Sequence, residues 1–140
     1  IYLVKSFITI STLGNGTEYG ELTVAKSFAG GCSNPIRGLY GGGTTNNSPR
    51  VRTDAIEYVT IASSGNTANF GDLTESRDSL AACASSIRGV FAGGQGGPSD
   101  AILNTIDCVE FLSTGNAVDF GDLIGTTTQN FACSNGHGGL

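Results

Sequence analysis

The sequence predicts an all-β protein built from three copies of one four-stranded unit. The stretch "TLGNGTEYGEL" at 12–22 recurs as "SSGNTANFGDL" at 63–73 and as "STGNAVDFGDL" at 113–123. Charged residues make up only 14% of the chain and glycine supplies 22 of its 140 residues. This composition disfavours long surface helices and fits short strands joined by turns. Together with the internal repeat, it predicts a single repeat domain over 1–140.

The repeat covers the whole chain. Glycines, aromatic residues and cysteines match in a constant order, at a shift of 51 between the first two copies and 50 between the last two. The expected units are approximately 1–25 together with 128–140, then 26–76, then 77–127.

Each unit is expected to fold as an antiparallel meander. The third strand alternates with period 2, and Gly and Asn in the "SSGN" loops supply positive φ. The four expected strands are exemplified by 78–86 (first), 87–94 (second), 55–63 (third) and 68–74 (fourth).

The two ends of the chain are expected to be complementary. The chain opens on a third and a fourth strand, closes on a first strand and the start of a second, "GHGGL", and holds two complete sets between them. A terminal first-and-second pair could complete the opening third-and-fourth pair and remove exposed sheet edges. The opening third and fourth strands are expected at 5–12 and 17–23, the two complete sets of four strands at 27–74 and 78–124, and the closing first strand at 128–134.

The repeat resembles the kelch repeat of β-propellers. "RGLYGGG" (37–43) and "RGVFAGG" (88–94) end a hydrophobic run in Gly-Gly, and the aromatics Tyr58 and Phe70 follow. The second aromatic is Phe or Tyr where the family usually has Trp, and Cys108 replaces the first aromatic in the third copy. The sequence stretches "GNAVDFGDL" and "CSNGHGGL" are similar to kelch-like repeats of tailed, especially marine, phages, which occur among virion and tail-fibre proteins.

Three kelch-like blades are too few to close around an axis, because closed rings typically have four to eight. Two chains could form one six-bladed ring by sharing split blades, or the chain could belong to a longer polypeptide. The third alternative is a threefold β-prism. The Gly-Gly signature favours blades over the prism.

Recurring polar residues are predicted to be structural. The acids of "FGDL" recur in every unit, so we expect them to bond nearby backbone N–H groups rather than to catalyse. Recurring basic residues are expected to pair with an acid of the adjacent unit, a contact worth about 0–1 kcal/mol if exposed. The acids are Glu21, Asp72 and Asp122, and the basic residues are Lys26, Arg37, Arg77 and Arg88.

The four cysteines are predicted to be small buried thiols. Cys32, Cys83 and Cys133 are equivalent positions on first strands, too far apart in neighbouring blades for the Cα separation of about 5.5 Å that a disulfide needs. Cys108 is likewise expected in the core. No Cys-x-x-Cys spacing indicates zinc.

No catalytic or cofactor motif is found. His137 is the only histidine, and there is no nucleophile elbow, P-loop or copper-oxidase ligand set. We therefore expect no enzyme, metal or cofactor. The net charge of −5 without a Lys or Arg run argues against nucleic acid, and the apolar stretches are too short for membrane insertion.

Function is expected in the loops that do not repeat, "GTTNNSPRVRT" (43–53) and "QGGPSDAILN" (95–104). The sequence, with its phage resemblance, predicts a structural or adhesive virion component of tail-fibre or capsid-surface type, located on the extracellular particle. It would assemble as a homo-oligomer or with other virion proteins through the split blade. The alternative is a lectin domain that binds host-surface glycans. The candidate contact residues are Asn46, Asn47, Arg50, Arg52, Gln95 and Asp100.

Overall fold

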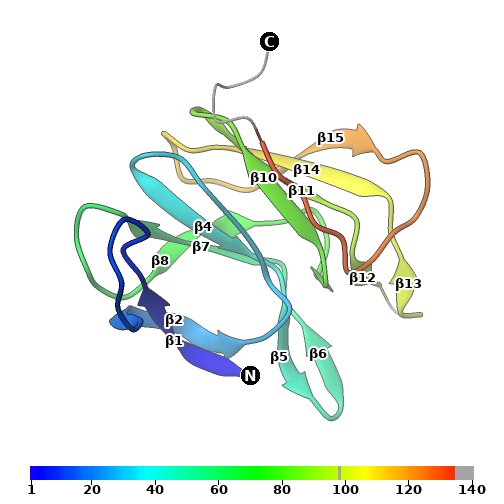
Figure 1. Cartoon of the computed structure of the whole chain (residues 1–140). Helices are drawn as coiled ribbons and strands as arrows, with labels where there is room; N and C mark the ends of the chain where they lie inside the picture. Colours follow the sequence, from blue (N-terminus) through cyan, green and yellow to red (C-terminus); the bar gives the residue numbers. More distant parts are fainter. Residues whose placement is uncertain (98, 135–140) are drawn as a thin grey trace.

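A computed structural model describes residues 1–97 and 99–134 of the chain, and within them the fold contains fifteen β-strands and no helix (Figure 1). The all-β prediction is confirmed. Two four-stranded antiparallel sheets, each a simple meander, form the body of the molecule. The second unit contains β3 (Gly30–Ser33), β4 (Arg37–Gly41), β7 (Ala55–Thr60) and β8 (Ala68–Asp72). The third unit contains β10 (Ala81–Ala84), β11 (Arg88–Ala92), β14 (Thr105–Glu110) and β15 (Val118–Asp122).

The two sheets repeat each other down to their irregularities. In the second unit the register of β7 on β8 shifts between Ile56 and Glu57, and in the third unit β14 on β15 shifts between Ile106 and Asp107. A bulge of this kind re-aims the side chain beside it. In these two units the repeat therefore specifies four strands and one bulge.

The first unit consists of one antiparallel pair, β1 (Tyr2–Phe7) and β2 (Thr17–Lys26). A strand was predicted over 5–12, but β1 ends at Phe7, which pairs with Thr17, and the residues between them form the connection. The shift of register seen in the other units recurs here between Lys5 and Ser6.

The predicted strand over 128–134 is wrong. First strands such as β3 and β10 pair with the second strand of their own sheet, whereas residues 128–134 pair with no strand among the described residues. An extended segment without a ladder partner is not a strand. The second strand expected at "GHGGL" lies outside the described residues, as does His137.

Two small sheets follow the Gly-Gly pairs, where loops were predicted. After the first pair, β5 (Thr44–Asn47) and β6 (Arg50–Arg52) form a hairpin, which projects from the lower edge of the molecule in Figure 1. After the second pair, β12 (Gln95–Gly96) lies between β13 (Ala101–Ile102) and β9 (Arg77–Asp78).

The core lies where the second and third units meet. β3 and β10, the two first strands, are neighbours. Glycines of one sheet make room for large side chains of the other: a Cβ at Gly41 would lie 2.7 Å from the fully buried ring of Phe91. The buried cluster is Leu39, Ile56, Phe70, Leu73, Leu80, Phe91, Val109 and Phe111.

Candidate functional site

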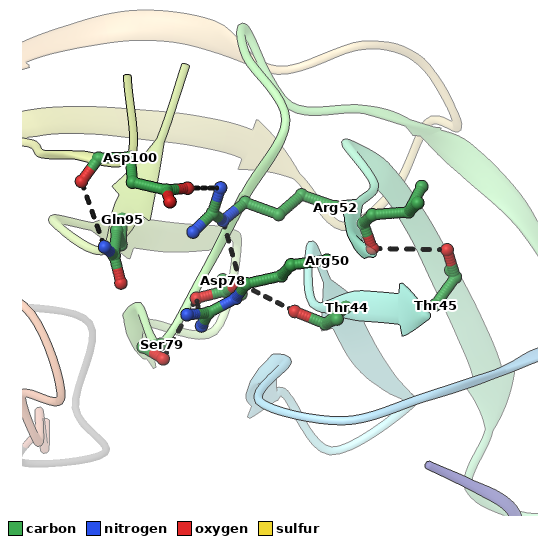
Figure 2. A network of polar contacts seen from close by, with 9 residues as sticks. Thr44, Thr45, Arg50, Arg52, Asp78, Ser79, Gln95 and Asp100 are labelled. Atoms are coloured by element: carbon green, nitrogen blue, oxygen red, sulfur yellow. Dashed lines mark hydrogen bonds and ion pairs between the residues drawn. The ribbon is translucent and has the colours of Figure 1, made fainter. Parts of the chain in front are cut away.

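A polar cluster joins the two segments that do not repeat, and Asp78 is its centre (Figure 2). The Asp78 carboxylate is fully buried. Arg50 donates to it twice, from Nε at 2.9 Å and from Nη2 at 2.7 Å. Arg52 Nε donates at 2.9 Å and Thr44 Oγ1 at 2.6 Å. Two arginines therefore share one buried carboxylate, which fixes the β5–β6 hairpin against the start of the third unit.

Arg52 extends the cluster to the second loop. Its Nη1 lies 2.5 Å from Asp100 Oδ1, and its side chain is only 8% exposed, against 64% for Asp100. Gln95 Nε2 donates to the backbone oxygen of Asp100 at 3.0 Å. Burial lowers the pKa of the Arg52 guanidinium, but Asp100 and Asp78 outweigh burial and hold this pKa above its ordinary value. The guanidinium is therefore a permanent positive link between the loops.

The structure brings together four of the six predicted contact residues. Asn46 and Asn47 lie outside the cluster, exposed on the hairpin. The reason is a register shift between Thr44 and Asn46, so that Thr44 is buried whereas Asn46 Oδ1 accepts from Ser48 N, at 3.1 Å, within the hairpin itself. The four that meet are Arg50, Arg52, Gln95 and Asp100.

Sequence analysis missed Asp78. It stands in a predicted first strand, beside the recurring Arg77, and was not assigned to a loop. The sequence does contain a signal for its role. The equivalent positions in the other units are Ser27 and Thr128, so Asp78 does not repeat, and neither do the arginines that it binds. When an acid and a basic residue both occur in only one copy of a repeat, an ion pair between them is a reasonable prediction.

A hollow of 360 Å³ opens beside the cluster. Arg50, whose side chain is 37% exposed, offers donors there, and Glu75 offers acceptors. Such a mixture suits a hydroxyl-rich or carbonyl-bearing ligand. In the part of the chain that the structure describes, no three His, Cys, Asp or Glu side chains are grouped to hold a metal ion. The lining residues are Arg50, Val51, Arg52, Glu75, Ser76 and Gly97.

Two recurring basic residues pair with acids, but the prediction of an acid in the adjacent unit is wrong, because each pair lies within one of the units 26–76 and 77–127 and in the interior. Lys26, at the end of β2, lies 2.7 Å from Glu57 Oε1 on β7, and Arg77, which follows β8, lies 3.0 Å from Asp107 Oδ2 on β14. All four side chains are at most 2% exposed. The first pair links β2 to the sheet of β7, and the second links β9 to the sheet of β14. Breaking a buried pair costs more than breaking an exposed one.

Burial raises the pKa of Glu57, but contacts with Lys26, Thr67 Oγ1 and Thr23 N–H outweigh burial, and the pKa lies below its ordinary value. Glu57 is therefore held in its charged form beside Lys26.

The pairing prediction is wrong for Arg37 and Arg88, which pair with no acid among the described residues. Arg37 instead donates from Nη1 to the backbone oxygen of Phe111 at 2.6 Å and stacks over the Tyr58 ring. A carbonyl of the neighbouring sheet thus replaces the expected carboxylate.

The acids of "FGDL" do not bond backbone N–H groups as predicted. Within 1–97 and 99–134 no hydrogen bond reaches the carboxylates of Glu21, Asp72 or Asp122. Their backbone groups are used instead: Asp72 N donates to Asn116 Oδ1 at 3.1 Å and Asp72 O accepts from Ala117 N at 2.7 Å. The main chain carries the recurring contact, so the side chain is free to be Asp or Glu.

All four cysteines are free thiols. Cys108 is buried, as predicted, whereas Cys32 and Cys83 are half-buried. The burial prediction is wrong for Cys133, which is exposed because no described residue covers this segment. Burial, with a smaller contribution from Cys83, raises the pKa of Cys32 to about 12, so this thiol stays protonated at neutral pH.

Comparison with known proteins gave no matching protein-family model and no match among curated proteins. The resemblance to kelch repeats therefore rests on the repeat residues themselves. Over 1–97 and 99–134 there is no helix with the length and apolar character needed to cross a membrane.

Proposed function

We propose that this chain is a non-enzymatic structural or adhesive component of a virion, of tail-fibre or capsid-surface type, built from kelch-like propeller blades. One observation carries the proposal: the second and third units match strand for strand, whereas the segments after their Gly-Gly pairs differ and are joined by the Arg52–Asp100 ion pair (Figure 2). A constant frame that presents variable, rigidly linked loops suits a surface that contacts a partner.

The propeller-type arrangement is supported by how consecutive sheets meet. β3 and β10 are first strands of successive units and lie next to each other, as the innermost strands of adjacent blades do. Buried ion pairs tie Lys26 and Arg77 to the following sheets.

A carbohydrate-binding lectin domain is the second candidate function. The exposed Asn46 and Asn47 offer amide donors and acceptors, and they pair across the hairpin with Val51 and Arg50, which line the hollow. Amides and charged groups of this kind hydrogen-bond sugar hydroxyls without needing a deep apolar pocket.

The experiment is to measure binding of the chain to candidate host cells and to a glycan array, for the native sequence and for Asn46→Ala/Asn47→Ala. An adhesive role predicts cell binding that falls about tenfold in the variant, equivalent to one or two lost hydrogen bonds. The control is Ser64→Ala, an exposed turn residue away from the hairpin.

Binding to particular glycans would favour the lectin. Absence of binding to any cell or glycan would contradict the adhesive role.

A further inference from the structure

Consecutive units meet through a backbone junction that has two distinct halves. In the first junction, Gly65 N donates to Tyr19 O at 2.8 Å, and Thr67 N donates to Glu21 O at 2.9 Å. Glu21 N in turn donates to Asn66 Oδ1 at 3.0 Å. One half is thus a Tyr-Gly-Glu segment of a fourth strand, and the other is the Gly-Asn turn of the next unit.

The second junction repeats the first bond for bond. Gly115 N donates to Phe70 O at 2.7 Å, and Asp72 N donates to Asn116 Oδ1 at 3.1 Å. The central glycine permits the approach: a Cβ at Gly71 would lie 2.1 Å from Gly115 O, and φ at Gly71 is +156°. The motif recurs because each unit contributes its Gly-Asn turn to the junction with the preceding unit and its fourth-strand segment to the junction with the following unit.

At one end of the described fold, the fourth-strand half has no counterpart. Gly121 has the same positive φ, +136°, but no atom lies within 4 Å of its ideal Cβ among the described residues. Phe120 is 59% exposed, whereas its equivalent Phe70, covered by the third unit, is 3% exposed. Val118 and Ile124 beside it are also exposed.

At the other end, the Gly-Asn half has no counterpart. Gly14 and Asn15 stand where Gly65 and Asn66 stand in the next unit. Both are exposed, and no described atom lies within 4 Å of the ideal Cβ of Gly14. The two ends therefore carry opposite halves of one junction.

The two ends also match each other because both lack the charged residues found at the interior junctions. At interior junctions a buried cation, Lys26 or Arg77, faces a buried acid on the next sheet. At the equivalent positions one end has Thr127 and the other has Ser6, which occupies the same bulge as Glu57. Joining these two ends would bury no unpaired charge, whereas joining either end to an interior-type face would bury one. The two ends therefore suit each other, and a second copy of the chain presents both of them.

We infer that two copies of this chain dock head to tail, with Phe120, Gly121 and Asp122 of each copy on the Gly14–Asn15 turn of the other. A head-to-tail contact closes into a ring or grows into a filament. Each copy contributes two four-stranded sheets and the β1–β2 pair. Counting each pair as a blade, two copies supply six blades, within the range of about four to eight for closed rings, whereas three copies would supply nine. The assembly deepens the proposed structural role, and rests on it only for the propeller-type arrangement of units.

The test is the mass of the chain in solution, by size-exclusion chromatography with light scattering across micromolar concentrations. The expected mass is twice the chain mass of 14.2 kDa. Gly121→Ala is expected to weaken the dimer by about 100-fold, because its Cβ would collide with the second copy's turn. Gly125→Ala, a nearby glycine also without an atom within 4 Å, is the control and should leave the dimer intact.

Charge exchange provides the second arm. Thr127→Arg alone should weaken the dimer, because it buries an unpaired charge, and adding Ser6→Asp in the same chain should restore it. Far-UV circular dichroism verifies that each variant is folded, and the charge arm still decides if Gly121→Ala fails to fold. A monomeric native chain, a mass that grows beyond two copies, or a Thr127→Arg dimer of native affinity would overturn the inference. Since Asn46 and Asn47 lie away from both ends, loss of cell binding and loss of the dimer are separable results.

Discussion

Replacing Gly71 tests how much the close backbone contact between consecutive units stabilises the fold. In Gly71→Ala the new Cβ would lie 2.1 Å from Gly115 O, at a φ of +156°. We expect the free energy of unfolding to fall by about 3 kcal/mol or more, because strain adds to a backbone collision. Urea denaturation measures it.

The matched control is Gly65→Ala. Gly65 has nearly the same φ, +151°, but no atom lies within 4 Å of its ideal Cβ among the described residues. Its loss should be about 1 kcal/mol, from strain alone. Equal losses at the two positions would show that the close approach to Gly115 does not matter.

At the scale of single residues, the sequence predicted which residues are structurally important, but not which of their atoms make the contacts. The repeat singled out Phe70, Gly71 and Asp72, and all three lie at a junction between units. The recurring contact was assigned to the Asp72 carboxylate, but the backbone makes it. A repeat shows where a constraint lies without distinguishing side chain from main chain.

Among the elements, the β5–β6 hairpin depends on one carboxylate. Asp78→Ala would remove the acceptor of Arg50 and leave the 8% exposed side chain of Arg52 with only the exposed Asp100 as its partner. We expect a loss of about 3–5 kcal/mol in the free energy of unfolding, the cost of an uncompensated buried charge. Thermal or urea unfolding measures it.

Asp100→Ala is the comparison, because the same Arg52 pairs with it but its side chain is 64% exposed. Its expected loss is about 0–1 kcal/mol. If Asp100 proved as costly as Asp78, burial would not be what makes the cluster strong.

The strands themselves were largely predictable, because period-2 patterns and Gly-Asn turns are local signals. The errors arose where a strand depends on a distant partner. Residues 128–134 have the sequence of a first strand but no ladder partner among the described residues, and β5–β6 forms because Asp78, far along the chain, holds it. Long-range charge pairing is not visible in a local window.

For the whole molecule, acid should lower the stability of the fold. The pKa of Glu57 is lower in the folded state than its ordinary value of about 4.3, so the unfolded chain binds the proton more tightly. The stabilisation is therefore present above the ordinary pKa and is lost as the pH falls through the folded one. The urea midpoint should drop steadily below about pH 4.5.

Glu57→Gln should flatten this acid dependence and also lower the midpoint at neutral pH, because Lys26 loses its partner. Glu110→Gln, an exposed acid at the end of β14, should leave the slope unchanged. An unchanged slope in Glu57→Gln would mean that other carboxylates control acid unfolding.

The junction between units is made of main-chain hydrogen bonds around a glycine, and this has an evolutionary consequence. Such a junction does not depend on what the loops carry, so recombination between repeats could add, remove or exchange a whole unit of about 50 residues without redesigning its neighbours. The loops could then diversify in sequence while the strands and junctions stay the same.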